Sequence, residues 1–490
     1  MAIDPSLHTP ATDHATISAA ATTTTSASGS ASTATAGGAH QETAAPSTLR
    51  IDPSSSAAVE RAIAAAHGAR REWARLSAGE RASNLKRAAD VAREQARDLG
   101  ALLCATTGRL AREAVSSATA AADLLDEAAV AGTLGAGRSL AGSPGSFDWV
   151  RVEPRGVVAV LTPWNDPYPA AAGLIAAALM TGNTVVHKPS ERSSEPGLML
   201  GRIIASCLPA GVLELVDGDG TVGAAIVADP RVDVVAHVGS TATGRAISRA
   251  TAARGAKSIV ENGGKDPIVV DADVDPAWAA EQIGIGCFTN GGQLCTAVER
   301  VYLHEAVADS VIAHLVRHAE ALRPGDPGDD ATTLTPIVDE RQLAVIDEHV
   351  RSAVAAGARC LTGGARLDRP GPWYAPTVLT DCTADMQVMR EETFGPVAPI
   401  TVVPSFGAGL DLACESDYGL AATVLTRDQR HATEAIERLD VGTVKVNAVF
   451  GGAPGGSADP RRGSGHGRGY GPDLFGEFVA LKAVHLEPAP

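Results

Sequence analysis

The pattern of apolar and polar positions divides the chain into a helical first part and an alternating second part. From Ser55 to Ala131, apolar residues recur at spacings of three and four with charged residues between them, which is typical of amphipathic helices. From Gly156 onward, short β-branched runs alternate with alanine-rich runs, and the expected strands are "GVVAVLT", "TVVHK", "LELVDG", "VDVVAHVG" and "KSIVE". This alternation predicts βαβ crossovers and therefore a parallel, doubly wound α/β sheet.

A second alternation begins at "GKDPIVVDADVD" and runs to about residue 445, which predicts a second α/β domain. Between the two parts, Gly and Ser interrupt the helical pattern over 135–146, and "FDWVRVEP" predicts a strand that leaves the main body. The first 45 or so residues are rich in Ala, Ser and Thr and almost uncharged, so they lack the apolar surface that would offset ordering and are expected to be disordered. They also lack a basic region before an apolar core, so no targeting role is expected.

Composition narrows the class of protein. A chain of 490 residues is expected to form roughly two to four domains. The net charge of −16 disfavours non-specific binding to nucleic acid, because a phosphate backbone repels an acidic surface. The seven cysteines contain no C-x-x-C pair, so neither a disulfide framework nor a metal site is indicated and a reduced, cytoplasmic location is expected. The longest aliphatic stretch, Ala170 to Met180, is too short to cross a membrane.

Chemically informative residues follow the predicted strands of the first sheet. In open parallel sheets, ligands bind where loops leave the carboxyl ends of strands. Gly239 and Ser240 begin a helix there, and the free N–H groups of a helix start can hold a phosphate. Taken alone, each motif is ambiguous: glycine-rich turns are common in α/β proteins, and Lys188 and Glu191 have the spacing of an ordinary surface pair.

Two further residues have a functional and a structural interpretation. Glu261 ends the strand "KSIVE", where it is either an exposed charge or, in a partly apolar cleft, a general base with a raised pKa. Cys295 lies in "NGGQLCT". A free cysteine usually packs in a core, but beside a base it can act as a nucleophile.

The order of the motifs resembles that of the aldehyde dehydrogenase superfamily, whose members are NAD(P)-dependent and non-phosphorylating. The matching motifs are "TPWN", "KPSE", "GST-x-x-G", "E-x-GGK", "GGQ-x-C", "EETFGP" and "GTVKVN". The resemblance extends from about residue 50 to the C-terminus. It implies a Rossmann-like cofactor domain, an α/β catalytic domain and a small β oligomerisation element, and hence a homodimer or homotetramer. The implied boundaries are a tail at 1–45, the cofactor domain at 46–131 and 153–262, the catalytic domain at 263–465, and the oligomerisation element at 132–152 and 466–490.

The resemblance also implies a mechanism. Cys295 would be the nucleophile that forms a thiohemiacetal and then a thioester with a small-molecule aldehyde. Asn165 would hold the oxyanion together with the Cys295 backbone N–H, and Glu261 would activate the water that releases a carboxylate.

The implied cofactor is NAD, with NADP possible, because a carboxylate at Glu191 accepts from a free ribose hydroxyl but repels a 2′-phosphate. The residues that match cofactor-binding positions are Thr162, Pro163, Trp164, Lys188, Glu191, Gly220, Gly223, Gly239, Ser240, Gly263, Glu392 and Phe394.

The residues that match substrate-pocket positions are Asp166, Gly173, Leu294, Thr296 and Asn447. Asp166 stands where the family often has an aromatic residue, and Gly173 where it has Trp or Arg. Succinate semialdehyde is therefore disfavoured, because that helix offers no cation. Asp166 either favours an aldehyde with a hydroxyl or amino group or is a plain surface-loop aspartate.

Three other departures leave roles open. Asn262 replaces the usual Leu after the catalytic Glu, His237 replaces an apolar or aromatic residue, and the loop 453–471 is longer than usual. His237 is either a new functional group or an adaptation of packing near the cofactor. A CoA-acylating enzyme is disfavoured because such members generally lack the glutamate, and a catalytically silent homologue is disfavoured because Cys295, Glu261 and Asn165 are all present.

Overall fold

The computed structural model describes residues 56–134, 137–452 and 456–489. The predicted disordered tail, residues 135–136 of the predicted oligomerisation element and residues 453–455 of the long loop lie outside the described residues. Within these ranges, no helix is both long enough and apolar enough to span a membrane.

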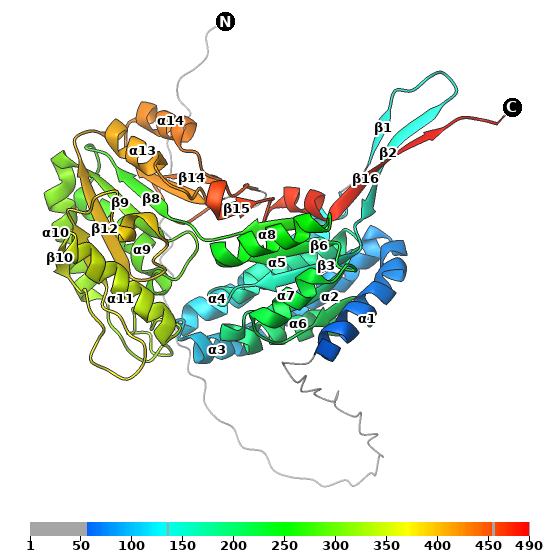
Figure 1. Ribbon diagram of the computed structural model, residues 1–490, viewed down its shortest axis with the longest axis horizontal. Coiled ribbons are helices and arrows are strands. Elements are labelled where there is room, and N and C mark those ends of the chain that lie inside the picture. The colour runs from blue at the N-terminus through cyan, green and yellow to red at the C-terminus, as the bar shows by residue number, and fades with distance from the viewer. Residues whose placement is uncertain (1–55, 135–136, 453–455, 490) are drawn as a thin grey trace, which may run out of the picture. The chain divides into compact units, whose positions relative to one another are not determined.

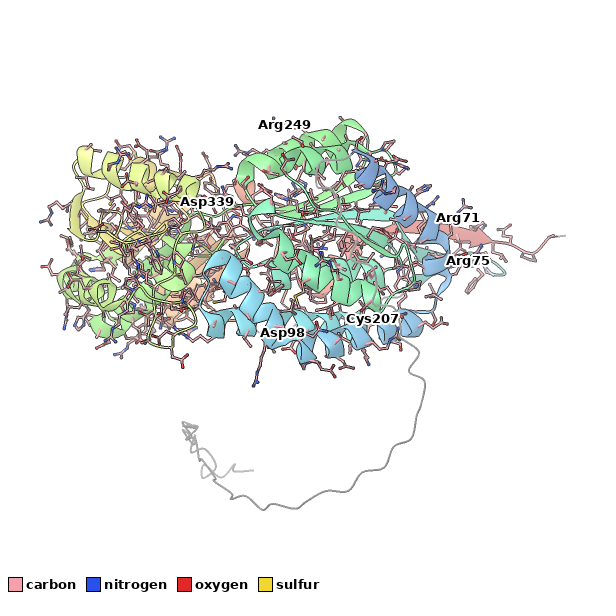
Figure 2. All side chains as sticks on the ribbon, turned by 90° about the horizontal axis from the view of Figure 1, so that it is seen from below. Arg71, Arg75, Asp98, Cys207, Arg249 and Asp339 are labelled. Atoms are coloured by element: carbon pink, nitrogen blue, oxygen red, sulfur yellow. The ribbon has the colours of Figure 1, made fainter. Side chains whose placement is uncertain are left out.

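The predicted helical part forms four helices. They are α1 (Ser56–Arg75), α2 (Ala78–Glu94), α3 (Ala96–Thr107) and α4 (Ala111–Ala131). The breaks have local causes: Ser77 caps α2 in a reciprocal capping box with Glu80, and Gly108 ends α3 with φ +75°, a conformation that favours glycine. Arg71 on α1 and Asp98 on α3 are exposed (Figure 2), while the alanines of the opposite faces are buried.

The first sheet has the strand order β15-β7-β6-β3-β4-β5. Its strands are β3 (Val157–Thr162), β4 (Thr184–Pro189), β5 (Leu213–Leu215), β6 (Val234–Val238), β7 (Lys257–Glu261) and β15 (Gly465–His466). Strands β3 to β7 pair in parallel, and only β15 is antiparallel. The helices between them are α5 (Pro167–Met180), α6 (Ser194–Ser206), α7 (Gly220–Ala228) and α8 (Thr241–Ala253). The predicted Rossmann-like α/β arrangement is confirmed (Figure 1).

The second sheet has the strand order β10-β11-β12-β9-β8-β13-β14. Its strands are β8 (Asp266–Val270), β9 (Val298–His304), β10 (Arg359–Thr362), β11 (Thr377–Thr380), β12 (Val397–Val403), β13 (Ala421–Leu425) and β14 (Thr443–Val446). Its helices are α9 (Pro276–Phe288), α10 (Glu305–Ala321), α11 (Glu340–Ala355), α12 (Gln387–Arg390), α13 (Phe406–Cys414) and α14 (Gln429–Arg438). Only β10 is antiparallel to its neighbour, so this sheet matches the predicted second α/β region.

A separate antiparallel sheet contains β1 (Arg138–Leu140), β2 (Phe147–Pro154) and β16 (Val479–Leu486). Strands β2 and β16 pair along their whole length, from Phe147 opposite Leu486 to Pro154 opposite Val479. Figure 1 shows the three strands as one twisted ribbon. Strands β1 and β16 fall within the predicted oligomerisation element, and β2 extends two residues beyond its bound at residue 152. The domain boundaries themselves stay a prediction.

The core of the first sheet is built from small aliphatic side chains, as the low aromatic content of 3% requires. Helix α5 is buried along almost its whole length, and five of its eleven buried residues are alanines. It packs against α4 and strands β3 and β4. This packing fixes the loop between β3 and α5, which carries Thr162 to Asp166.

Candidate active site

Cys295 lies just after α9, beyond a tight turn, η2 (Thr289–Gly292). Asn290, Gly291 and Gly292 all have positive φ angles, of 51°, 64° and 71°. A Cβ at Gly292 would overlap the carbonyl oxygen of Gly395, so the second glycine of "GGQ" is required for this close approach. The turn that precedes Cys295 therefore lies directly against the segment that carries Phe394.

Gln293 fixes this turn through its buried side chain. Its Nε2 donates to the carbonyl oxygens of Asn290, at 2.9 Å, and Pro336, at 3.1 Å. Its Oε1 accepts from Val338 N at 2.9 Å. Because all three bonds are to backbone atoms, the side chain holds the loop two residues before Cys295 in one position.

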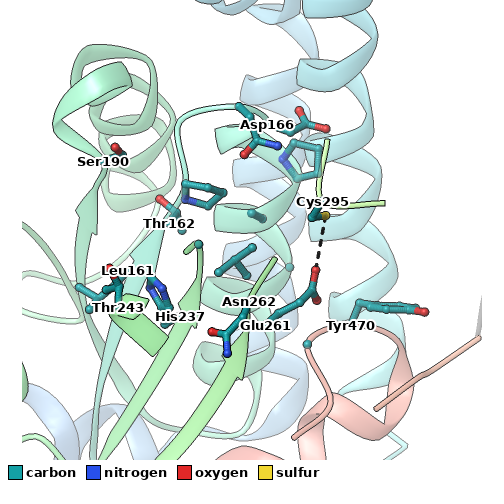
Figure 3. A pocket seen from close by; sticks show the side chains of 18 of the residues that line it. Leu161, Thr162, Asp166, Ser190, His237, Thr243, Glu261, Asn262, Cys295 and Tyr470 are labelled. Atoms are coloured by element: carbon teal, nitrogen blue, oxygen red, sulfur yellow. Dashed lines mark hydrogen bonds between the residues drawn. The ribbon is translucent and has the colours of Figure 1, made fainter. Parts of the chain in front are cut away.

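The structure brings Cys295, which follows α9 of the second α/β region, against Glu261 of the first sheet. The Sγ of Cys295 lies 3.9 Å from Oε1 of Glu261, which ends β7 (Figure 3). Burial raises the pKa of Glu261, and the contact with the thiol offsets part of this rise. Burial also holds the pKa of Cys295 well above its usual value, and the carboxylates of Glu261 and Asp266 raise it further. The thiol is therefore protonated at neutral pH and lies beside a carboxylate that is a better base than a surface glutamate.

Asn165 lies beside the same turn. Its side chain is buried, and its Nδ2 donates to the carbonyl oxygen of Gln293 at 3.1 Å. Arg109, two residues before α4, donates to the Asn165 carbonyl oxygen at 3.2 Å and to Asp166 Oδ1 at 2.7 Å. Ser117 on α4 also donates to Asp166 Oδ1. Asn165 and Asp166 are thus held by α4 and the residues just before it, and the guanidinium of Arg109 balances the charge of Asp166.

A buried ion pair positions the "EETFGP" segment. Lys265 Nζ donates to Glu299 Oε2 at 2.6 Å and to Thr393 Oγ1 at 3.1 Å. Glu299 in turn accepts from the backbone N–H groups of Thr393, at 2.7 Å, and Phe394, at 2.8 Å. This network holds Phe394 at φ 52°, with its ring edge-on to Trp164 at 5.5 Å between centroids.

Glu392 is held close to the turn after β7. Its Oε1 accepts from the backbone N–H of Gly264 at 3.1 Å, and a Cβ at Gly263 would overlap its carboxylate. Burial and the neighbouring Glu299 raise the pKa of Glu392 to about 8.

A cavity of about 1770 Å³ joins these groups. Every residue predicted to bind the cofactor lines it, as do Cys295, Glu261 and Asn165. Gly220 lies at the start of α7, where an added Cβ would meet nothing within 4 Å and would project into open space. Lys188 lies 3.9 Å from Glu191, and Ser240 caps α8 by accepting from Thr243 N. A helix start, a lysine and a carboxylate that line one cavity match the phosphates and ribose hydroxyls of a dinucleotide, so the residues present fit this cofactor.

The predicted substrate residues are spread over different environments. Asp166 and Gly173 line the large cavity, while Thr296 lines a second cavity of about 270 Å³ with Glu261, Lys445, Phe450 and Tyr470. Among the described residues, those lining the two cavities do not include Leu294 or Asn447. The Asn447 side chain instead hydrogen-bonds both backbone groups of Thr426, at 2.9 and 3.0 Å.

Sequence reasoning missed several residues beside this site: Arg109, Glu299, Lys445 and Tyr470. Lys445 lies inside the recognised motif "GTVKVN". A charged residue within a short apolar strand could have indicated that this side chain lies beside the site. Its Nζ lies 5.5 Å from the centre of the Phe450 ring. Burial lowers its pKa, and the neighbouring Asp266 and Cys295 oppose that effect. The other three residues lie outside every recognised motif.

The two unusual polar residues are both buried beside the cavity. His237, at the end of β6, is 8% exposed, and Asn262 follows Glu261 directly. Asn262 Nδ2 donates to the carbonyl oxygen of Gly463 at 3.0 Å, and its Oδ1 packs against Gly244. Within the described residues, no group of three or more His, Cys, Asp or Glu side chains is placed to hold a metal ion.

Comparison with known proteins agrees with this geometry. The family model described as "Aldehyde dehydrogenase family" matches residues 39–484. The chain belongs to the aldehyde dehydrogenase family. It is therefore an oxidoreductase that acts on aldehydes.

Relatives of this aldehyde dehydrogenase include enzymes named for several substrates. It is 36% identical over 445 residues to the 3,6-anhydro-alpha-L-galactose dehydrogenase of Streptomyces coelicolor, with 90% of each chain covered. Among solved structures, the lactaldehyde dehydrogenase of Escherichia coli matches with a TM-score of 0.86 and 32% identity, over 88% of this chain and 91% of that one. A 3,6-anhydro-L-galactose dehydrogenase in complex with NADP matches with a TM-score of 0.85 and 34% identity, over 88% and 92% of the two chains.

Proposed function

We propose that this aldehyde dehydrogenase oxidises an aldehyde to a carboxylate through a thioester on Cys295. The observation that carries the proposal is the 3.9 Å contact between Cys295 Sγ and Glu261 Oε1 beside the Asn165 amide. A nucleophile beside a base with a raised pKa is the arrangement that covalent catalysis needs.

The chain's own residues account for the proton and charge movements. Glu261 accepts the thiol proton as Cys295 Sγ forms a bond to the aldehyde carbon. The developing oxyanion accepts hydrogen bonds from the Asn165 amide and the Cys295 backbone N–H, and loss of one such donor costs about 3 kcal/mol. Departure of a hydride from the same carbon leaves a thioester on Cys295. Glu261 releases the thiol proton to solvent and then takes a proton from water, whose oxygen attacks the thioester carbon, and the carboxylate leaves as the thiolate is restored.

The cofactor of the proposed reaction is NAD, with NADP as the second candidate. When bound, the nicotinamide accepts the hydride. Lys188 and Glu191 would hold the adenosine ribose, Ser240 and Gly239 the diphosphate, and Glu392 and Phe394 the nicotinamide end. The Glu191 carboxylate, which is half exposed at the edge of the cavity, disfavours a 2′-phosphate by like-charge repulsion.

The proposed substrate is a polar aliphatic aldehyde that carries a hydroxyl group. Asp166 lines the cavity with Oδ1 already accepting from Arg109 and Ser117, so its carboxylate can accept from a substrate hydroxyl. Because Arg109 balances the charge of Asp166, an ammonium group gains less there than a hydroxyl. Relatives named for lactaldehyde and 3,6-anhydro-galactose support the same class. Free cysteines throughout the described residues are consistent with a cytoplasmic location.

The decisive experiment measures formation of reduced dinucleotide from a panel of aldehydes, with and without CoA. Wild-type enzyme should form carboxylate without CoA, and Cys295→Ala should abolish it. Cys360→Ala is the matched control, because Cys360 is an exposed cysteine away from the cavity. Undiminished activity in Cys295→Ala, or a strict need for CoA, would refute the mechanism.

The substrate proposal has its own test. We expect kcat/KM to be higher for lactaldehyde than for propanal in the wild type, and this preference to fall about tenfold in Asp166→Phe, which corresponds to about 1.4 kcal/mol. Equal kcat/KM for the two aldehydes in the wild type would reject the substrate class while leaving the mechanism intact.

A further inference from the structure

The second cavity, of about 270 Å³, adjoins the reaction centre. Glu261 and Tyr470, both labelled in Figure 3, line it and the large cavity alike, and Thr296, the residue after Cys295, also lines it. None of the residues predicted to bind the cofactor is among its described lining residues. Because a water molecule occupies about 30 Å³ in the liquid, this space can hold several atoms of a group attached to the reacting carbon.

Lys445, on β14, supplies an ammonium group to this cavity. Its Nζ lies 5.5 Å from the centre of the Phe450 ring, and it forms no hydrogen bond or ion pair within the described residues. Lys445 is partly exposed, and its Nζ is not one of the side-chain atoms that are fully buried without a partner. The three N–H donors of the ammonium are therefore unused and open to a ligand in the cavity.

Lys445 is near the reacting cysteine. A Cβ on Gly264 would lie 2.6 Å from the Cys295 carbonyl oxygen and 2.8 Å from Asp266 Oδ1, so Asp266 lies close to the Cys295 backbone. Asp266 Oδ1 also accepts from the backbone N–H of Ala421 at 3.1 Å, and Ala421 lines the second cavity together with Lys445. The charges of Asp266 and Cys295 both act on the ammonium. A group bonded to Cys295 Sγ is therefore near Lys445.

The charges in the second cavity favour a neutral, oxygen-bearing group. Glu261 lines it with a carboxylate and Lys445 with an ammonium. An anionic substrate group is repelled by Glu261 and a cationic one by Lys445, so each gains less from the group of opposite charge. A hydroxyl group carries neither penalty. Its oxygen accepts from Lys445, and its proton can be donated to the Thr296 hydroxyl, which has no hydrogen-bond partner within the described residues.

We propose that Lys445 determines substrate choice by donating a hydrogen bond to a hydroxyl group on the third carbon of the aldehyde, held in the second cavity. The third carbon is two bonds beyond the carbon that joins Cys295 Sγ, which suits a side chain close to that sulfur. The inference rests on the proposed function and deepens it. With the first hydroxyl group at Asp166, the substrate is an aldehyde that carries two hydroxyl groups or more.

Steady-state kinetics with two matched aldehydes separates a substrate contact of Lys445 from a general effect on Cys295. Glyceraldehyde differs from lactaldehyde only by a hydroxyl group on the third carbon. For each aldehyde, kcat/KM of Lys445→Met is divided by that of the wild type, so that hydration of the aldehyde cancels. We expect kcat/KM to fall about tenfold for glyceraldehyde, chiefly through a higher KM, and to change little for lactaldehyde, because only glyceraldehyde loses a hydrogen bond to a charged donor. Lys445→Arg, which keeps a charged donor, should retain part of the preference.

Lys86→Met is the matched control, because Lys86 is exposed on α2 and lines neither cavity. It should change kcat/KM for neither aldehyde. An equal fall for both aldehydes in Lys445→Met that melts like the wild type, or an unchanged kcat/KM for glyceraldehyde, would overturn the proposal. So would a wild-type enzyme that uses succinate semialdehyde better than glyceraldehyde. Each of these results leaves the thioester mechanism standing, whereas undiminished activity in Cys295→Ala would refute that mechanism whatever the ratio.

Discussion

At the scale of single residues, the electrostatics of the site depend on carboxylates around one thiol. Burial comes first among the causes that raise the pKa of Cys295, and Glu261 is the next. Glu261 therefore has two opposed effects in the proposed mechanism. It accepts protons during turnover, yet its negative charge disfavours the thiolate in the ligand-free enzyme.

These two effects separate in Glu261→Gln. Removing the carboxylate lowers the pKa of Cys295, so the pH profile of its alkylation by iodoacetamide should move to lower pH and the rate at a fixed pH below that pKa should rise. Turnover should fall at least 100-fold, because general-base catalysis contributes about 10²–10⁴. Mass spectrometry of the Cys295 peptide across a pH series measures the first effect, and steady-state kinetics the second.

The Cys360→Ala background removes an exposed competing thiol from this experiment. A profile that moves to higher pH in Glu261→Gln would show that the hydrogen bond from the thiol outweighs the repulsion between the two charges.

At the scale of elements, the buried Lys265–Glu299 pair joins the starts of β8 and β9 to the segment before β12. Both side chains are almost fully buried, and Glu299 also accepts two backbone N–H groups from Thr393 and Phe394. The pair therefore determines where Phe394 lies in the cavity.

Removing one partner leaves an uncompensated buried charge. Glu299→Ala should lower the free energy of unfolding by about 3–5 kcal/mol, measured by urea denaturation. The matched control is Glu340→Ala, which breaks the solvent-exposed pair with Arg366 and should cost less than about 1 kcal/mol. Equal losses in the two variants would contradict the structural role assigned to Glu299.

The apolar spacing of the helical region predicts its extent but not its division into separate helices. The three- and four-residue spacing predicted helix throughout 55–131, and helix is found from Ser56 to Ala131 with short breaks. The breaks at Ser77 and Gly108 each depend on one capping residue. The apolar spacing continues through both positions, so periodicity alone does not separate the four helices. Similarly, the predicted strand "LELVDG" is strand only at Leu213–Leu215, because the Asp217 side chain and Gly218, at φ 143°, bend the chain away.

At the scale of the whole molecule, the sheet of β1, β2 and β16 exposes apolar side chains. Phe147 is 58% exposed, Leu481 66% and Leu486 53%. A three-stranded sheet with exposed apolar residues and open edges is a typical surface for association between chains. This supports the predicted homodimer or homotetramer.

Light scattering after size exclusion tests the association. The wild-type chain should be an oligomer, and Leu481→Glu should shift it towards the monomer, because a charge would be buried in the interface. Val354→Glu is the matched control, since Val354 is 45% exposed on α11, away from these strands. A wild-type monomer, or an oligomer indifferent to Leu481→Glu, would argue against this interface.

The sequence by itself determined the α/β architecture and the residues expected to bind the cofactor, all of which line the large cavity. Strand and helix periods are local properties, and parallel strands place their carboxyl ends at one edge, so Asn165, Lys188, Ser240 and Glu261 could be grouped without coordinates. The ordered motifs added Cys295 to the same group.

Only the tertiary structure decided which partners surround these residues. The negative charge of Asp166 is balanced by Arg109, and its carboxylate also accepts a hydrogen bond from Ser117. Both partners are distant in sequence, so the β3–α5 loop alone does not show that this charge is paired. Asn447 was expected at the substrate, but its amide is used to hold Thr426. His237 has two possible roles by sequence, and the tertiary structure places it buried at 8% exposure, with Gly239 packed against its ring. Hydrogen-bond saturation and charge balance depend on contacts between distant segments, and periodicity carries no information about those contacts.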